Sequence, residues 1–325
     1  MDFNQIFKIN SDEKFEALAL EVFKFQYAEN KVYQEFCDLI QTDVENVKTL
    51  QDIPFLPVEF FKSHNVVSGE FNPEITFLSS GTTGQQQSKH HVKNLEIYKK
   101  SFQTTFEDFY GDIQDYIIIG LLPSYLERKG SSLIYMVDDF IKTSLFSESG
   151  FYLDELDSLS EKLIEIDQRN KKILLIGVSF ALLDLVETHQ FQLKNTIVME
   201  TGGMKGRRKE MIRKELHEHL SKGFGVENIH SEYGMTELLS QAYSKGKSLF
   251  SCPNHMKIMI RDPEDPFHYL DKHKTGGINV IDLANIHSCS FIATQDLGKK
   301  VNTQEFEILG RFDHSDIRGC NLMVL

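Results

Sequence analysis

The feature that most constrains this chain is a run of glycine and hydroxyl side chains directly after a short apolar stretch. The apolar stretch ends at Leu78, Lys89 lies shortly beyond the run, and the run itself is Ser79, Ser80, Gly81, Thr82, Thr83 and Gly84. Glycines allow positive φ values and close backbone approach, while hydroxyls, free amides and a lysine donate to phosphate oxygens. We therefore predict a phosphate-binding turn at the end of a strand, with a nucleoside triphosphate as its natural ligand.

The spacing of this turn differs from that of two common nucleotide-binding motifs. A P-loop ends in Gly-Lys-Ser/Thr, and dinucleotide-binding folds carry a Gly-x-Gly-x-x-Gly fingerprint after a strand. Residues 79–89 fit neither pattern. The turn is therefore assigned to another class of nucleotide-using protein.

Composition and charge exclude several kinds of partner. The chain has 325 residues, 41% of them hydrophobic, which suffices for a sizeable core in one large domain or in a domain with a small appendage. Lys and Arg number 35 against 48 Asp and Glu, and the net charge of −13 disfavours nucleic acid and anionic membrane surfaces. The sequence has no apolar run of bilayer-spanning length, and its N-terminus lacks a basic segment followed by an apolar one. We expect a cytoplasmic protein without integral membrane association.

Cysteine and histidine spacing gives no sign of a zinc site or a disulfide framework. The four cysteines, Cys37, Cys252, Cys289 and Cys320, form no Cys-x-x-Cys pair. The twelve histidines include none in a His-Glu-x-x-His arrangement. We expect reduced thiols, and histidines that belong to the surface or the core.

Apolar periodicity predicts an α/β fold with a largely parallel sheet flanked by helices. Helical spacing after a capping Ser11 predicts two helices in the first 45 residues, and Pro54 and Pro57 predict an extended segment packed on the core. From Ile75 onward, continuous apolar runs alternate with amphipathic stretches, which is typical of parallel strands joined by helices. Strands are expected near residues 75–78, 116–122, 173–176, 196–199 and 228–231, and helices near 95–109, after 131, and near 156–166, 180–186 and 207–220.

The pattern changes after about Ser244, where short strands separated by turns predict a β-rich region. These strands are expected at residues 256–260, 277–283, 289–293 and 306–309. We therefore divide the chain into an α/β core with N-terminal helices, residues 1–243, and a C-terminal β-rich subdomain, residues 244–325. Ligands of such α/β sheets bind at the carboxyl ends of the strands.

Three further clusters lie where this architecture places loops at strand ends. Paired glycines in Thr201-Gly202-Gly203-Met204-Lys205 either approach a flat ligand or form an ordinary strand-to-helix turn. The run Tyr233-Gly234-Met235-Thr236-Glu237 offers a ring for a base, a hydroxyl for phosphate and a carboxylate for Mg²⁺, although a capped turn uses the same residue types. The third cluster, Arg311-Phe312-Asp313, is typical of a surface ion pair when taken alone.

Together, and in this order, these clusters resemble the acyl-adenylate-forming superfamily of acyl-CoA ligases, luciferases and peptide-synthetase adenylation domains. The resemblance runs from about Ile53 to the C-terminus. It implies that Thr236 and Lys89 act on phosphate, that Glu237 binds Mg²⁺, and that the hinge arginine is Arg311. It further implies an ATP site formed by the phosphate-loop residues 79–84 together with Gly202, Gly203, Lys205, Tyr233 along the adenine, Gly234, Thr236, Asp296 on the ribose, and Arg311.

The sequence also departs from that superfamily in ways that bear on its architecture. Gln85, Gln86 and Gln87 stand where the family usually has proline before the lysine, and Gln295 replaces a glycine before the aspartate. The chain ends soon after the hinge motif, where a typical member begins a small C-terminal domain with a catalytic lysine. We expect a fold like the large N-terminal domain of these enzymes, without the small domain.

This shortened form resembles the acyl-protein synthetases of bacterial bioluminescence, the long-chain-fatty-acid luciferin-component ligases. The similar segments are Pro54-Phe55-Leu56-Pro57, Phe60-Phe61-Lys62, Gly202-Gly203-x-Lys205 and Arg318-Gly319-Cys320. The resemblance implies that ATP and Mg²⁺ convert a carboxylic acid, here a long-chain fatty acid, to acyl-AMP. The acyl group then passes to Cys320 and on to an acyl-accepting protein such as a reductase or a carrier protein.

Two alternatives stay open at this point. The acceptor could be coenzyme A or a carrier-protein phosphopantetheine, as in the related phenylacetate ligases, with Cys320 inert. The chain could also be a non-catalytic nucleotide-binding subunit, although the intact Thr236 and Glu237 argue against that interpretation.

Overall fold

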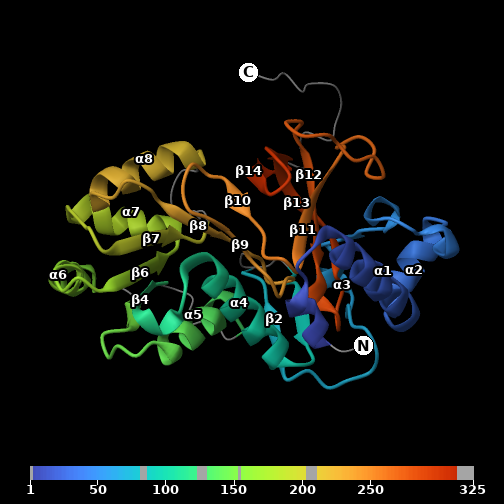
Figure 1. Ribbon diagram of the computed structural model, residues 1–325, viewed down its shortest axis with the longest axis horizontal. Coiled ribbons are helices and arrows are strands. Elements are labelled where there is room, and N and C mark those ends of the chain that lie inside the picture. Colours follow the sequence, from blue (N-terminus) through green and yellow to red (C-terminus); the bar gives the residue numbers. More distant parts are fainter. Residues whose placement is uncertain (1–2, 81–85, 123–129, 153–154, 203–210, 313–325) are drawn as a thin grey trace.

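Twelve strands of the described residues form one large sheet, and two further strands form a separate hairpin (Figure 1). The computed structural model describes residues 3–80, 86–122, 130–152, 155–202 and 211–312. The strands are β1 (Leu56–Pro57), β2 (Ile75–Leu78), β3 (Lys89–Val92), β4 (Tyr116–Leu121), β5 (Gly150–Tyr152), β6 (Lys172–Gly177), β7 (Thr196–Glu200), β8 (His230–Tyr233), β9 (Ala242–Ser244), β10 (Phe250–Ser251), β11 (Met256–Arg261), β12 (Gly276–Asp282), β13 (Phe291–Lys300) and β14 (Glu305–Arg311). The order in the large sheet is β11-β12-β13-β14-β10-β9-β8-β7-β6-β4-β5, and β1 pairs with β13 beside this path.

The helices cover both the sheet and its N-terminal flank. They are α1 (Asp12–Glu29), α2 (Lys31–Leu39), α3 (Phe60–Ser63), α4 (Leu95–Tyr110), α5 (Ser132–Thr143), α6 (Leu156–Asp167), α7 (Ser179–Thr188) and α8 (Arg213–Phe224). Short 3₁₀ helices lie at Phe3–Lys8, Val44–Asn46, Leu50–Asp52, Ile113–Asp115 and Leu283–Asn285. Within the described ranges, no helix is both long enough and apolar enough to cross a membrane.

One half of the sheet is parallel, as the sequence predicts. Strands β5, β4, β6, β7 and β8 pair in parallel, with α7 and α8 over one face and α4 and α5 over the other (Figure 1). Every residue of β4 is buried, and β6 is buried from Ile173 onward. Coverage on both faces is the reason that these strands read as continuous apolar runs rather than alternating ones.

The other half of the sheet is antiparallel, apart from β1, which pairs in parallel with β13. Strand β9 pairs with β8 on one side and β10 on the other, and the antiparallel order continues through β14, β13, β12 and β11. The predicted β-rich region is thus present, and it extends the same sheet as the parallel strands. The division into two units at residue 243 stays a prediction.

Some predicted elements differ from the observed ones. Strand β2 does not join the large sheet but pairs only with β3, because the chain reverses after Leu78 and its nearest hydrogen-bonding partner is the segment that returns. The charged helix predicted from residue 207 has extended backbone at Ile212 and begins, within the described residues, at Arg213. Strand β13 runs beyond the predicted residue 293 to Lys300, since its second half pairs with β14.

The N-terminal segment is anchored to the antiparallel half. Ser11 caps α1 by accepting a hydrogen bond from the backbone N–H of Lys14, as predicted. The buried amide of Gln26 donates to the backbone oxygens of Asn285 and Ile286. The extended segment around Pro54 and Pro57 packs on the core as expected, with Leu56 fully buried where β1 pairs with β13.

We expect Gly223→Ala to destabilise the protein by about 1–3 kcal/mol, although alanine normally favours a helix over glycine. A Cβ at Gly223 in α8 would overlap the Val186 side chain at its Cβ, which cannot move without its backbone. Urea unfolding of Gly223→Ala beside Gly150→Ala measures this, because a Cβ at Gly150 meets no atom within 4 Å. Equal stability of the two variants would contradict close packing of α7 on α8.

Candidate functional site

The predicted phosphate loop connects the two strands of the β2–β3 hairpin. Ser79 and Ser88 close its base, because the Ser88 backbone N–H donates to Ser79 Oγ at 2.9 Å and the Ser79 N–H donates to the Ser88 oxygen at 3.1 Å. Ser80 and Lys89 are exposed. The loop residues Gly81, Thr82, Thr83 and Gly84 lie outside the described residues. The hairpin thus carries the predicted loop at its turn, with Lys89 opposite Leu78.

A buried histidine joins this hairpin to the predicted Tyr233–Glu237 motif. His90 is fully buried, with Nδ1 2.8 Å from the backbone oxygen of Thr236 and Nε2 2.9 Å from Oδ1 of Asn285. Burial lowers the pKa of His90 to about 4, so the ring is neutral near pH 7 and donates in only one of these contacts. The side-chain amide of Asn285 donates to the backbone oxygens of Glu237 and Cys289 at 2.7 and 2.9 Å.

The predicted magnesium ligand touches the same hairpin. Glu237 is 6% exposed, and burial raises the pKa of its carboxyl, while a hydrogen bond with the Ser88 side chain lowers it. A buried carboxylate beside hydroxyl oxygens is a set of hard donors that suits Mg²⁺, which commonly binds one or two carboxylates together with substrate phosphates and water. The residues present therefore fit the predicted cation.

Three other predicted residues meet in one hydrogen-bonded group. The Tyr233 hydroxyl donates to Asp296 Oδ2 at 2.8 Å, and Arg311 Nε donates to Asp296 Oδ1 at 3.1 Å. Asp296 and Arg311 are also cross-strand neighbours on β13 and β14. The predicted hinge arginine therefore pairs with the predicted ribose ligand. Asp313, its neighbour in the sequence motif, lies outside the described residues.

The Tyr233 ring is held by aromatic neighbours. Its centroid lies 6.2 Å from those of Phe250 and Phe306, in edge-on geometry, and the residue is 9% exposed. Burial and the Asp296 carboxylate raise the pKa of Tyr233 well above its usual value, so the hydroxyl stays protonated and serves as a donor.

Gly234 leaves space for a neighbouring carboxyl group. A Cβ at Gly234 would lie 2.5 Å from Oε1 of Glu232. Burial and the nearby Glu200 charge raise the pKa of Glu232 to about 8, so this carboxyl is mostly protonated at neutral pH. The glycine of the Tyr-Gly-x-Thr-Glu pattern thus makes room for a side chain of its own strand.

The second glycine cluster begins at the end of β7. Gly202 has a φ of 78°, and its backbone N–H donates to Oε2 of Glu200 at 2.6 Å. Gly203 and Lys205 lie outside the described residues. The described part of the cluster therefore sits at the carboxyl end of a parallel strand, adjacent to β8, which leads into Tyr233.

Sequence reasoning missed Glu200 and Asn285 and left His90 unassigned. Each of them acts through contacts with residues distant in sequence or through backbone atoms, which no spacing pattern encodes. The apolar strand that ends at Glu200 was the one available signal, since a carboxylate at such a strand end is seldom left without a partner.

The described cysteines are poor nucleophiles. Cys37, Cys252 and Cys289 are free thiols. Burial raises the pKa of Cys37 and of Cys252 to about 12, and it raises that of Cys289 further. Little thiolate forms at such sites near neutral pH. Cys320, the predicted acyl acceptor, lies outside the described residues.

A cavity of about 650 Å³ lies beside the predicted site, between the segment after α2 and strands β11–β13. Its walls include Phe36, Phe55, Arg261, Tyr269, Gln295 and Phe312. The extended segment of Pro54 and Pro57 thus packs on the core and also forms one wall of this cavity. Those predicted ATP-binding residues that the structure describes do not line it.

Comparison with known proteins gives one family and one fold. The family model described as "Acyl-protein synthetase, LuxE" matches residues 5–325. No curated protein sequence matches the chain significantly.

Solved structures with the same fold include ATP-bound MatB from Rhodopseudomonas palustris, with 17% identity, a TM-score of 0.54, and coverage of 74% of this chain and 49% of that chain. They also include 2-hydroxyisobutyryl-CoA ligase in complex with 2-HIB-AMP and CoA, with 12% identity, a TM-score of 0.69, and coverage of 93% of this chain and 68% of that chain. The chain spans about half the length of the MatB structures.

We expect Asn285→Ala to cost about 3 kcal/mol or more in unfolding free energy. The change leaves the buried Glu237 and Cys289 oxygens and one His90 nitrogen without a partner, at about 1–3 kcal/mol each. The control is Asn46→Ala, which removes an exposed contact to Asp43 and should stay within about 0.5 kcal/mol. Denaturant titration of both variants measures the difference, and a loss below about 1 kcal/mol for Asn285→Ala contradicts the proposed link.

Proposed function

The chain belongs to the acyl-protein synthetase family, whose model spans residues 5–325, and from this premise we propose that it activates a carboxylic acid with ATP. The contact of Ser88 with Glu237 carries the proposal, because it sets the predicted metal ligand against the base of the predicted phosphate loop. The His90 contact with the Thr236 backbone supports the same juxtaposition.

The first step forms an acyl-adenylate. A carboxylate oxygen of the substrate attacks the α-phosphorus of ATP, the bond from that phosphorus to the bridging oxygen breaks, and pyrophosphate leaves with the bonding electrons. Lys89, the Thr236 hydroxyl and the hydroxyls of the loop hold the phosphates, while Asp296 and Tyr233 bind the nucleoside. Donors fixed in advance stabilise the charge that develops on phosphate oxygens in such a reaction.

A bound Mg²⁺ would supply further neutralisation of the phosphate charge. Glu237 is the residue that would hold it, with phosphate oxygens and water as the remaining ligands. Burial raises the pKa of the Glu237 carboxyl, whereas a nearby cation would lower it and so favour the ionised form.

The second step transfers the acyl group to a thiol. The thiolate of Cys320 attacks the carbonyl carbon of the acyl-adenylate, a thioester forms, and AMP leaves with the electrons of the broken bond. The raised pKa values of Cys37, Cys252 and Cys289 disfavour those thiols as carriers, which supports Cys320. The acyl group then passes to an acceptor protein such as a reductase or a carrier protein.

A long-chain fatty acid is the proposed substrate, because the sequence resembles the long-chain-fatty-acid luciferin-component ligases. A second candidate acceptor is coenzyme A, because the 2-hydroxyisobutyryl-CoA ligase that shares this fold is solved with CoA bound. The two acceptors differ in whether the protein itself becomes acylated, so the mass of the intact chain separates them.

ATP–pyrophosphate exchange tests acid activation. With Mg²⁺ and a panel of fatty and aromatic acids, we expect exchange with long-chain acids, and an about 100-fold or larger loss in Glu237→Gln. Residues that only orient metal ligands already cost about 10- to 100-fold when changed. The matched control is Glu227→Gln, an exposed glutamate that should keep full exchange.

Two results contradict this proposal. Absence of exchange with every acid favours a nucleotide-binding subunit without catalysis. Full exchange in Glu237→Gln removes the glutamate from metal binding.

Intact-mass measurement tests the acceptor. After incubation with ATP and the preferred acid, we expect the wild-type chain to gain one acyl group that neutral hydroxylamine removes, because thioesters react with it. The Cys320→Ser variant should keep exchange and gain no such group, whereas Cys252→Ser should behave as the wild type. An equal adduct on Cys320→Ser contradicts the assignment, and acyl-CoA formation without any adduct favours the CoA alternative.

A further inference from the structure

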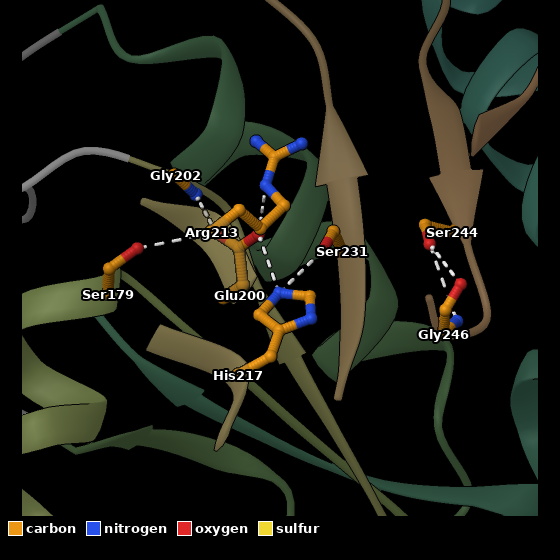
Figure 2. A network of polar contacts seen from close by, with 8 residues as sticks. All are labelled: Ser179, Glu200, Gly202, Arg213, His217, Ser231, Ser244 and Gly246. Atoms are coloured by element: carbon orange, nitrogen blue, oxygen red, sulfur yellow. Dashed lines mark hydrogen bonds and ion pairs between the residues drawn. The ribbon is translucent and has the colours of Figure 1, made fainter. Parts of the chain in front are cut away.

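A buried carboxylate stands at the base of the Gly202 turn. Glu200 is the last residue of β7 and is 1% exposed. Its Oε2 accepts hydrogen bonds from the Gly202 backbone N–H at 2.6 Å and from the Ser179 hydroxyl at 3.3 Å (Figure 2). The carboxylate therefore ties the turn to the first residue of α7.

Two side chains of α8 face the other oxygen of this carboxylate. Arg213 Nε lies 3.4 Å and His217 Nε2 lies 3.5 Å from Glu200 Oε1 (Figure 2). The Ser231 hydroxyl of β8 lies 3.3 Å from the same His217 nitrogen. Glu200 thus connects the end of β7 with α7 and α8, and through His217 it is linked to β8.

The charge of Glu200 is held in place by these neighbours. Burial by itself would raise the pKa of the carboxyl, but hydrogen bonds from His217 and Ser231 and the positive charge of Arg213 lower it to about 2. The carboxylate is therefore ionised throughout the neutral range. A buried charge persists only where paired groups compensate its lost hydration.

The cluster also reaches the tyrosine of the nucleotide motif. The Arg213 guanidinium lies 4.8 Å from the centre of the Phe250 ring, and Phe250 meets the Tyr233 ring edge-on at 6.2 Å. Glu200 thus fixes the glycine turn directly and supports the Tyr233 ring through Arg213 and Phe250.

Two polar atoms next to this carboxylate have no partner among the described residues. They are Oγ1 of Thr201 and Nη1 of Arg213, and both are buried. Thr201 lies between Glu200 and Gly202, and Arg213 contacts Glu200 through its Nε. Buried polar atoms in folded proteins nearly always have a partner, and among the described residues these two leave hydrogen-bonding capacity for a polar ligand at the turn.

We propose that Glu200 is a positioning residue for the adenosine part of ATP, holding the Gly202 turn and Arg213 so that the Thr201 hydroxyl and the Arg213 guanidinium face the ligand. This inference rests on the proposed function, since it takes ATP as the nucleotide. Glu200 itself does not touch the ligand and acts through Gly202 and Arg213.

Isothermal calorimetry with Mg-ATP and the full chain tests the proposal. Glu200→Gln keeps the shape of the side chain but removes the charge that holds Arg213 and His217. We expect the Kd for ATP to rise about tenfold, which corresponds to the loss of one charge-assisted hydrogen bond. Ser179→Ala keeps the charge, preserves the fold, and should raise the Kd about threefold by loosening one contact. The control is Glu148→Gln, which weakens an arginine–carboxylate contact with Arg169 remote from the turn and should leave the Kd unchanged.

Exchange kinetics separate positioning from general destabilisation. A positioning role raises the KM for ATP in Glu200→Gln and Ser179→Ala and leaves the KM for the acid as in Glu148→Gln, whereas loosening of the whole fold raises both. ATP affinities of both variants equal to that of Glu148→Gln overturn this inference and leave the proposed function intact. A wild-type chain that binds no ATP overturns both.

Discussion

The candidate site depends on the buried contact between His90 and Asn285. His90 lies in β3 of the phosphate-loop hairpin, and Asn285 lies beyond β12, yet the two side chains contact the backbone oxygens of Thr236 and Glu237. The Asn285 amide donates to the Glu237 oxygen, and neutral His90 donates either to the Thr236 oxygen or to Asn285 Oδ1, so these buried contacts hold the segments together without adding charge. This link joins the predicted phosphate-loop hairpin to the predicted metal-binding motif.

The large sheet explains why the remaining residues converge. Parallel strands β7 and β8 end at Glu200 and Tyr233, and antiparallel strands β13 and β14 place Asp296 and Arg311 as cross-strand neighbours. Tyr233 joins the two halves through its hydrogen bond to Asp296. The site therefore lies where the parallel half of the sheet meets the antiparallel half, and both halves contribute charged or polar groups.

Electrostatics differ sharply between neighbouring glutamates of this region. The pKa of Glu200 is lowered to about 2, although burial opposes this, because His217, Ser231 and Arg213 favour its charge. The pKa of Glu232 is raised to about 8 by burial and by the charge of Glu200. The pKa values of these two neighbouring carboxyl groups shift in opposite directions, so only one of the two is charged near neutral pH. The charged one is the residue that also binds the Gly202 backbone.

The sequence by itself determined the α/β class and most strand and helix positions, and it predicted the residues of the candidate site that belong to compact motifs. Those features depend on local periodicity and on neighbouring residues, as in the fully buried strand β4 or the segment from Tyr233 to Glu237. Only the tertiary structure decided that β2 leaves the large sheet, that Arg311 pairs with Asp296, and that His90, Asn285 and Glu200 organise the site. These contacts join residues far apart in the chain or use backbone atoms, so no residue pattern in the sequence indicates them. They form because buried polar groups need hydrogen-bonding partners.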